Sequence, residues 1–188
     1  MSLQIIGIAA GILLIVISIA LINNLIRKKN AVQNIFGDVD ALLKKRYDLI
    51  PNLVSSVKQY MIHEKTLLAE LTDMRTRAIN PDISAEEKID IQNKVRRSLD
   101  GIMVAVEAYP DLKASRNFLQ LQAALNEVEE QISAARRAYN ATVTAYNNAV
   151  KTIPSNLIAL LMRYKKKAVM ETPEHERENI SVKKLFSS

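Results

Sequence analysis

Residues 44–64 read KKRYDLIPNLVSSVKQYMIHE and place two charged residues, Arg46 and Glu64, at helical positions where apolar side chains are expected. Outward from this stretch, apolar residues recur at alternating steps of four and three, which is the spacing of packed helices. This seam comprises Val32, Phe36, Val39, Leu43, Arg46, Ile50, Leu53, Val57, Tyr60, Glu64, Leu67, Leu71, Met74 and Ala78. It predicts one long helix that is bent near Pro51, because proline removes a backbone donor and crowds the preceding turn.

The predicted first helix ends at residues 80–82, where Asn-Pro-Asp interrupts the repeat. Ser84 and Glu87 follow at the spacing of a capping box, in which each side chain satisfies a backbone N–H at the start of a helix. We expect a second helix from there to about Val106, and then a turn at residues 109–111, which read Tyr-Pro-Asp. The expected apolar face of this second helix comprises Ile89, Val95, Leu99, Ile102, Met103 and Val106.

A third helix has the most regular seam in the chain. Ser115 can cap its start, and Pro154 is expected to end it. One register of the seam holds Phe118, Leu125, Ile132, Tyr139, Tyr146 and Ile153, and the other holds Leu121, Val128, Ala135, Thr142 and Ala149. Residues 155–163 indicate a short fourth helix.

The fold class that follows is all-α. No alternating β-branched stretch competes with the helical pattern, and 4 glycines and 5 prolines among 188 residues allow few turns. We predict an N-terminal transmembrane helix in residues 1–26, and an elongated antiparallel bundle of three long helices plus a short fourth in residues 27–165. The charged, aperiodic residues 166–188 are predicted to form a mostly disordered tail.

The transmembrane prediction rests on residues 3–22, which contain no charged side chain. Twenty residues at about 1.5 Å each span about 30 Å, the thickness of the bilayer hydrocarbon. A cleaved signal peptide is the main alternative. It would carry a basic start and a small-x-small cleavage site, and this chain has no Lys or Arg before the apolar run and Asn-Asn-Leu-Ile at residues 23–26. We therefore expect the segment to be retained as an anchor in the lipid bilayer.

Residues that flank or punctuate the span suggest its orientation and packing. Arg27, Lys28 and Lys29 follow it directly, so the positive-inside rule predicts a cytoplasmic helical domain and an external N-terminus in the inner (plasma) membrane. Gly7 and Gly11 form a GxxxG pair that permits close approach of two spans, although glycine is also common in spans without this role.

Lys165, Lys166 and Lys167 form a further basic run in this chain, whose net charge is +6. The run can be a solvated helix end or a contact with anionic lipid head groups. Lysine and arginine are not gathered with aromatic residues on one helix, so we predict no nucleic-acid partner.

Sequence signals for catalysis are absent. There is no cysteine, which excludes disulfides and thiolate sites. His63–Glu64 begins like a zinc-protease HExxH, but the last position is Leu67, and His175–Glu176 fails in the same way at Asn179. No Walker loop, GxGxxG or GxSxG occurs. We therefore predict no enzyme activity, no cofactor and no metal site.

Five blocks resemble the LemA family of bacterial membrane proteins. They are RYDLIPNLV at 46–54, VKQYMIHEK at 57–65, EAYPDLKASRNFLQLQ at 107–122, ARRAYNATVTAYNNAV at 135–150 and IPSNLIA at 153–159. The likeness extends from about residue 24 to 165 in the family's order and spacing. It implies a helical bundle without established catalytic activity, and a functional link to membrane proteolysis or envelope quality control.

The two charged seam residues predict polar contacts between helices. Arg46 and Glu64 are 18 residues apart, about 27 Å along a helix, so they cannot pair with each other. Each needs a partner on another helix, because an unpaired buried charge is costly. The candidate polar core or interaction cluster is Arg46, Asp48, Asn52, Tyr60, Glu64, Glu107, Tyr109, Asp111, Arg136, Tyr139 and Asn140, with Lys113, Arg116 and Arg137 as further partners and Tyr146, Asn117 and Asn147 as further polar groups.

Two interpretations of this cluster remain open. The polar groups can fix the register between helices, as a single asparagine does in coiled coils, or they can line a cleft that receives a partner. The sequence favours a non-enzymatic, membrane-tethered scaffold or adaptor for other membrane proteins that acts by helix-face docking. The alternative is a self-assembling, membrane-organising homo-oligomer built through the span and the helix seams.

Overall fold

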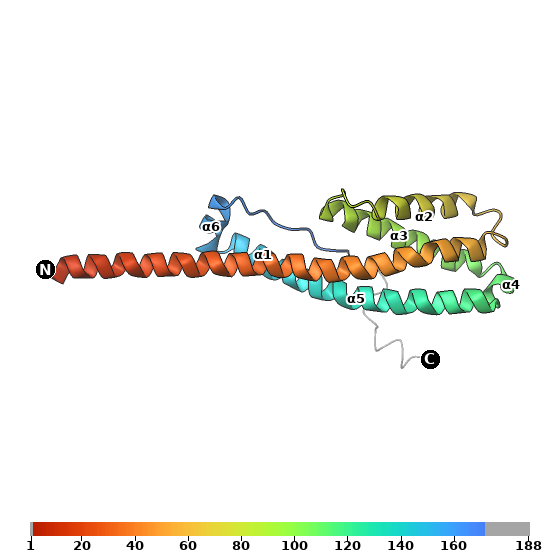
Figure 1. The fold of residues 1–188 in the computed structure, drawn as a ribbon, viewed down its shortest axis with the longest axis horizontal. Helices are drawn as coiled ribbons and strands as arrows, with labels where there is room; N and C mark the ends of the chain where they lie inside the picture. Colours follow the sequence, from red (N-terminus) through yellow and green to blue (C-terminus); the bar gives the residue numbers. More distant parts are fainter. Residues whose placement is uncertain (1, 172–188) are drawn as a thin grey trace, which may run out of the picture.

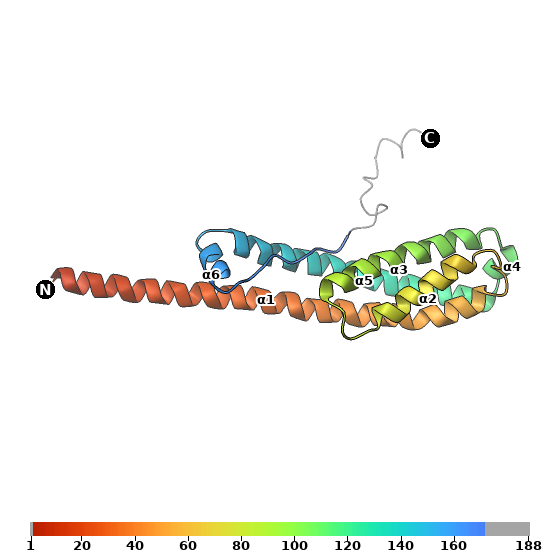
Figure 2. The ribbon, with the colours of Figure 1, turned by 90° about the horizontal axis from the view of Figure 1, so that it is seen from above.

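A computed structural model describes residues 2–171, which contain six helices and no strand, and this confirms the all-α class. The helices are α1 (Ser2–Val57), α2 (Lys65–Ala78), α3 (Ala85–Val106), α4 (Pro110–Lys113), α5 (Arg116–Lys151) and α6 (Ser155–Leu161). Helices α1 and α5 lie side by side and antiparallel, the α2–α3 hairpin covers the end farthest from the N-terminus, and the first part of α1 projects alone (Figures 1 and 2).

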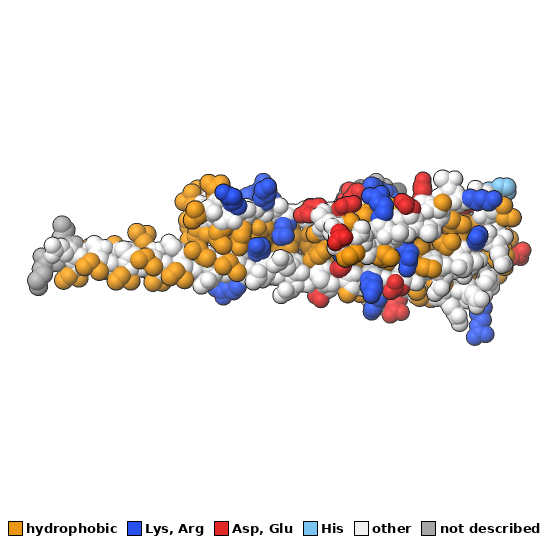
Figure 3. Space-filling view, turned by 45° about the horizontal axis from the view of Figure 1, so that its top comes forward, with side chains coloured by type: hydrophobic (Ala, Val, Ile, Leu, Met, Phe, Trp, Pro, Cys, Tyr) orange, Lys and Arg blue, Asp and Glu red, His pale blue; other side chains and the backbone are white. Residues whose placement is uncertain are grey.

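The projecting part of α1 is the predicted span. Its apolar side chains are exposed, and the only described helix long and apolar enough to cross a membrane contains it. Hydrophobic side chains line this segment on the face seen in Figure 3. Burial on α1 begins at Leu25, whose exposed fraction is 1%. The bundle therefore starts one turn after the apolar run ends at Ile22.

The first long helix ends at Val57, and not at residues 80–82 as the apolar repeat predicted. Helix α1 has 56 residues and continues without a break through Pro51. Residues 58–64 then reverse the direction of the chain before the separate helix α2. Helix α5 has 36 residues and extends about 54 Å, so it cannot cover a helix that continues to Ala78. Folding back instead buries Leu68 and Leu71 against the bundle. Consequently Tyr60 and Glu64 lie in a loop and not on a helical seam.

The other predicted helices are confirmed with small corrections. Ser84 accepts a hydrogen bond from the Glu87 backbone N–H at 3.1 Å, whereas Ser115, at the N-cap of α5, makes no side-chain cap. Ile153 does not extend the α5 seam, because the helix ends at Lys151 and Ile153 is 78% exposed. The buried positions of α5 include Phe118, Leu121, Leu125, Val128, Ile132, Tyr139, Val143 and Tyr146.

The segment after α6 differs most from expectation. Arg163 has a left-handed φ of 53°, and the Tyr164 N–H bonds to the Ala159 carbonyl at 2.8 Å, which closes the helix and turns the chain back. Residues 164–171, called the strap here, then run extended beside α5 (Figure 2). Residues 166–171 of the predicted, mostly disordered tail therefore lie ordered against α5, while residues 172–188 lie outside the described part of the chain.

Candidate functional site

Two asparagines on α5 hold the backbone of the strap. The Asn147 amide donates to the Lys167 carbonyl at 2.9 Å and accepts from the Lys167 N–H at 2.9 Å. Asn140 makes the same pair of bonds with Met170, at 2.9 and 2.8 Å. Each amide therefore satisfies both polar groups of one extended residue, as a neighbouring strand would. This contact recognises the backbone and not the side chains of the strap.

Two tyrosines complete this ladder. The Tyr146 hydroxyl donates to the Lys165 carbonyl at 3.0 Å, and the Tyr139 hydroxyl donates to the Ala168 carbonyl at 3.1 Å. Burial raises the pKa of both hydroxyls, which keeps them in the neutral form that can donate. Both pairs read Tyr-Asn and stand seven residues apart, so they lie on one stripe of α5.

A buried ion pair joins α1 to α5. Arg46 is 1% exposed, and its Nη1 lies 2.6 Å from Oε2 of Glu129, which is 37% exposed. The Nε and Nη2 atoms of Arg46 have no hydrogen-bond partner among residues 2–171. The prediction that Arg46 needs a partner on another helix is confirmed. The partner, however, is Glu129, which was not among the candidates.

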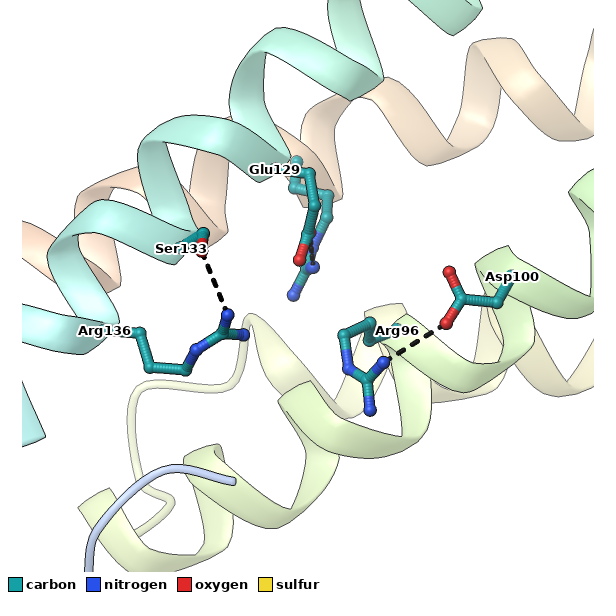
Figure 4. Close-up of polar contacts among 6 residues, drawn as sticks. Arg96, Asp100, Glu129, Ser133 and Arg136 are labelled. Atoms are coloured by element: carbon teal, nitrogen blue, oxygen red, sulfur yellow. Dashed lines mark hydrogen bonds and ion pairs between the residues drawn. The ribbon is translucent and has the colours of Figure 1, made fainter. Parts of the chain in front are cut away.

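Two more arginines approach the same interhelical space. Figure 4 shows Arg136 and Glu129 of α5 extending into the space between α5 and α3, and Arg96 of α3 lying across that space beside Asp100. Arg136, also 1% exposed, donates to the Ser133 Oγ at 3.1 Å, and Arg96 pairs with Asp100 at 3.2 Å. The interior between α1, α3 and α5 is therefore polar and rich in guanidinium groups, in contrast to the apolar seam on either side of it.

Glu64 lies at the opposite end of the bundle from the span, where it contacts the segment before α4. The Tyr109 hydroxyl donates to both carboxylate oxygens of Glu64, at 2.9 and 3.0 Å. This hydrogen bond raises the pKa of Tyr109, because ionising the hydroxyl would place two negative charges together. Glu107 pairs with Lys113 nearby. The Tyr109–Glu64 contact ties the loop of residues 58–64 to the α3–α4 turn, and the Glu107–Lys113 pair spans that turn.

The predicted polar residues do not form one cluster. Arg46 and Arg136 lie in the polar interior, Tyr139 and Asn140 hold the strap, and Glu64, Glu107 and Tyr109 lie at the end of the bundle far from the span. The remaining predicted residues, Asp48, Asn52, Tyr60 and Asp111, are exposed. The tyrosine hydroxyls are likewise divided, because Tyr139 and Tyr146 bind the strap and Tyr109 binds Glu64.

An apolar groove also opens at the end far from the span, between the last turns of α1 and the outer face of α2. Its volume is about 660 Å³. The residues that line it are Val54, Lys58, Met61, Ile62, Lys65, Leu68, Ala69, Thr72, Asp73 and Thr76. Lys58, Lys65 and Asp73 supply the charges, and the rest of the wall is apolar or bears hydroxyl groups. This groove can hold an apolar ligand segment.

Gly7 and Gly11 of the predicted span and the three basic residues after it all lie on α1. A Cβ added at Gly7 or Gly11 would meet no atom within 4 Å, so both lie on an open face of α1. The Arg27 Nε donates to the Asn23 carbonyl one turn earlier at 3.3 Å, Lys28 follows on the same helix, and the Lys29 ammonium lies 4.5 Å from the centre of the Tyr164 ring. The last contact is a cation–π interaction that attaches the start of the strap to α1.

Some of these functional candidates were missed from the sequence. Glu129 lies next to Val128 and off the apolar register, so periodicity alone did not select it. The groove was missed because residues 58–64 were interpreted as helix. The repeated Tyr-Asn pair was visible in the sequence, and its spacing of seven could have indicated a ladder. Within residues 2–171, no three His, Asp or Glu side chains gather as metal ligands would.

Comparisons with known proteins agree with this architecture. The LemA family model matches residues 35–183, which is most of the chain. Protein LemA of Metamycoplasma hominis is 26% identical over 163 residues, covering 87% of this chain and 74% of that protein. Magnetosome protein MamQ of Magnetospirillum gryphiswaldense is 23% identical over 180 residues, covering 79% of this chain and 66% of that protein.

A further MamQ protein, MamQ 2 of Paramagnetospirillum magneticum, is 23% identical over 155 residues. That match covers 69% of this chain and 57% of the relative, so the chain spans little more than half of that protein's length. The family match, the helical bundle and the apolar N-terminal helix agree with one another. The chain therefore belongs to the LemA family and is a membrane-associated protein of the LemA type.

Proposed function

We propose that this protein is a non-enzymatic, membrane-tethered adaptor that holds a segment of another membrane protein. The observation that carries the proposal is the apolar groove between α1 and α2, which is open to solvent at the end of the bundle farthest from the span. A volume of about 660 Å³ is within the range of ligand-binding sites. Its position between two helices suits an amphipathic helix, whose apolar face would replace water in the groove.

The rim of the groove sets the chemistry of the partner. Lys58 and Lys65 are exposed at the end formed by the loop of residues 58–64, and Asp73 lies farther along α2. A partner segment with an acidic residue next to its apolar face would meet the two ammonium groups. Such rim charges raise the rate of association and the specificity more than the affinity itself.

The length of α1 sets where the partner docks. From Ile22 at the end of the apolar run to Val54 in the groove, the helix continues for 32 residues, or about 48 Å. An adaptor of this shape would engage a segment that extends well away from the bilayer. Partners from membrane proteolysis or envelope quality control, which the family likeness implied, are among the membrane proteins that the proposal admits.

Photocrosslinking from the groove in living cells tests the proposal. A photoreactive residue at Ile62, which lines the groove and is 58% exposed, should capture a membrane protein that can be identified by mass spectrometry. The same residue at Val104 on α3, 74% exposed and outside the groove, is the control. Equal capture from both positions would show that the groove is not selective and would overturn the adaptor proposal.

A blocking variant makes the test sharper. Ala69 is exposed within the groove, so Ala69→Arg should fill it without disturbing the core and should abolish capture from Ile62. Ala123→Arg places the same change on an exposed site of α5 and should leave capture unaltered. Persistent capture in the Ala69→Arg variant would mean that the partner contacts the loop of residues 58–64 and not the groove.

Self-assembly through the span is the second candidate function. The observation in its favour is the open face around Gly7 and Gly11, where no other atom approaches within 4 Å of an added Cβ. We expect full-length protein in mild detergent to form oligomers that Gly7→Leu and Gly11→Leu disperse, because larger side chains keep two helices apart. A monomer at micromolar concentration would remove this function.

The proposed location of the bundle is the cytoplasmic side of the inner membrane, with the N-terminus outside. It rests on Arg27, Lys28 and Lys29, which immediately follow the span. Because the chain has no cysteine, a single cysteine at Val104 would be the only target for a membrane-impermeant thiol reagent. Labelling of intact cells at this position would reverse the proposed orientation.

A further inference from the structure

The end of the bundle next to the span carries an unusually apolar corner. Leu157, Leu160 and Leu161 of α6 are 65%, 79% and 85% exposed, and Ile153 just before the helix is 78% exposed. Scattered exposed hydrophobic residues are ordinary, but four large ones within nine consecutive residues form a patch that marks an interaction surface. Ala159 is 1% exposed, so α6 packs its Ala159 side against the bundle and its leucines face outward.

The corner lies beside α1 at the end of its apolar run. Helix α6 contacts both α1 and α5, and Figures 1 and 2 place it beside α1 where the projecting part begins. Leu25, the first fully buried residue of α1, follows Ile22 by three residues, or about 4.5 Å. A helix lying in a bilayer interface buries its apolar face about 5–10 Å into the boundary between head groups and acyl chains. The outward leucines are therefore within reach of the same bilayer.

The charge distribution fits an anionic surface at this end. Residues 1–37 and 131–170 contain no Asp or Glu, and they include the span, α6 and the stretches of α1 and α5 beside α6. Arg163, Lys165 and Lys166 are exposed directly after α6, and Lys151 is exposed directly before it. On the face in Figure 3, acidic side chains appear only farther from the span. Basic residues at this level would meet lipid phosphates, whereas the mixed charges beyond it face water.

We propose that α6 is a second membrane contact, with Ile153, Leu157, Leu160 and Leu161 inserted into the interfacial layer of the leaflet from which α1 emerges. The exposed basic residues that flank α6 bind the phosphate groups of anionic lipids. The bundle is then attached to the bilayer at two places, the span and the α6 corner, and this fixes which of its faces points toward the membrane. The proposal is independent of the groove between α1 and α2.

Fluorescence of full-length protein in nanodiscs tests this contact. The chain has no cysteine, so Leu160→Cys gives one site for an environment-sensitive fluorophore, and Val104→Cys is the matched control at a site of similar exposure far from the span. With one copy per disc of phosphatidylcholine and phosphatidylglycerol, the label at position 160 should shift to the blue and lose quenching by aqueous iodide. It should also be quenched by spin-labelled acyl chains, whereas the label at position 104 should respond only to iodide.

Two outcomes would overturn the proposal. The first is iodide quenching at position 160 equal to that at position 104. The second is protection that occurs only when two copies share a disc, which would assign the patch to a contact between copies of the chain.

The charge component has its own test. In discs containing phosphatidylglycerol, Lys165→Glu combined with Lys166→Glu should weaken the acyl-chain quenching of the label at position 160, with little effect in discs of phosphatidylcholine alone. Both lysines are exposed, so the bundle should melt as the unaltered protein does. An equal loss of quenching in both lipids would overturn the assignment of these lysines to anionic head groups.

Discussion

Two polar contacts on α5, the Arg46–Glu129 pair and the Tyr-Asn ladder, stabilise different kinds of structure. The ion pair lies inside a helix–helix interface, where α1 and α5 already satisfy their own backbone groups. The ladder lies against an extended segment that cannot satisfy its own backbone, and four side chains provide six hydrogen bonds to it. The difference implies that an apolar pair can replace the ion pair, whereas an apolar residue cannot replace an asparagine of the ladder.

The largest effect is expected from breaking one side of the ion pair. Glu129→Ala leaves the Arg46 guanidinium buried without its carboxylate, and we expect the free energy of unfolding to fall by about 2–4 kcal/mol. The value is lower than for a fully buried pair because Glu129 is 37% exposed. Chemical denaturation of the full chain in detergent, with Glu130→Ala at the adjacent exposed site as control, measures it.

A double variant separates the need for charge from the need for contact. Arg46→Met together with Glu129→Met removes both partners and retains apolar volume, so most of the lost stability should return, to within about 1 kcal/mol of the unaltered protein. If the double variant is as unstable as Glu129→Ala, the pair is required for the interface itself. The ion pair and the ladder would then be equally irreplaceable.

The next effect is local and concerns the ladder. Asn147→Ala removes both hydrogen bonds to Lys167, and the strap should detach there at a cost of about 1–3 kcal/mol for the two bonds. Amide hydrogen exchange of residues 165–170 should accelerate while the α1–α5 pair stays protected, because only the strap depends on this side chain.

Asn148→Ala changes the neighbouring exposed asparagine and should leave exchange in the strap unaltered. Acceleration that spreads to Ile132 and Val39 would show that strap and core unfold together, contrary to the comparison of the two contacts.

A smaller effect is expected at the end of the bundle far from the span. Tyr109→Phe removes the hydroxyl that donates to Glu64, so the free energy of unfolding should fall, but by less than for Asn147→Ala because Tyr109 is partly exposed. Tyr60 lies in the same loop as Glu64 and its side chain is 40% exposed, so Tyr60→Phe should change the free energy of unfolding little. Glu64→Leu should resemble Tyr109→Phe. A much larger loss for Glu64→Leu would favour the interpretation in which this residue fixes the register between helices.

The weakest effect is a dependence on alkaline pH. Burial raises the pKa of Tyr47, Tyr139 and Tyr146, and the bond to Glu64 raises that of Tyr109. The stability that these groups contribute is fully present below the ordinary tyrosine value of about 10, and it is lost as pH rises through the raised values. Phenolate absorbance should therefore titrate later in the native than in the denatured protein. Coincident titrations would contradict the raised pKa values at both the ladder and the far end.

The amino-acid pattern by itself determined the helical class, the apolar span and most buried positions. A 3.5-residue repeat places its apolar residues on one face of a helix, and an apolar run of twenty residues matches the thickness of the bilayer hydrocarbon. Both predictions therefore rest on local chemistry. The Ser84 cap and the burial of Phe118, Leu125 and Ile132 follow from such short-range patterns. The need for a partner at Arg46 also followed, because the cost of an unpaired buried charge does not depend on where the partner comes from.

Only the tertiary structure decided where α1 ends, which residue pairs with Arg46 and how the strap is held. The repeat continues from Val57 toward Ala78, and it is the finite length of α5 that makes the chain fold back at residues 58–64. Glu129 is adjacent to Arg46 only because α1 and α5 pack in one particular register. The sequence of the strap has no periodicity that would predict its conformation. Asn140 and Asn147 of α5 hold it extended, and this contact exists only once the helices have assembled.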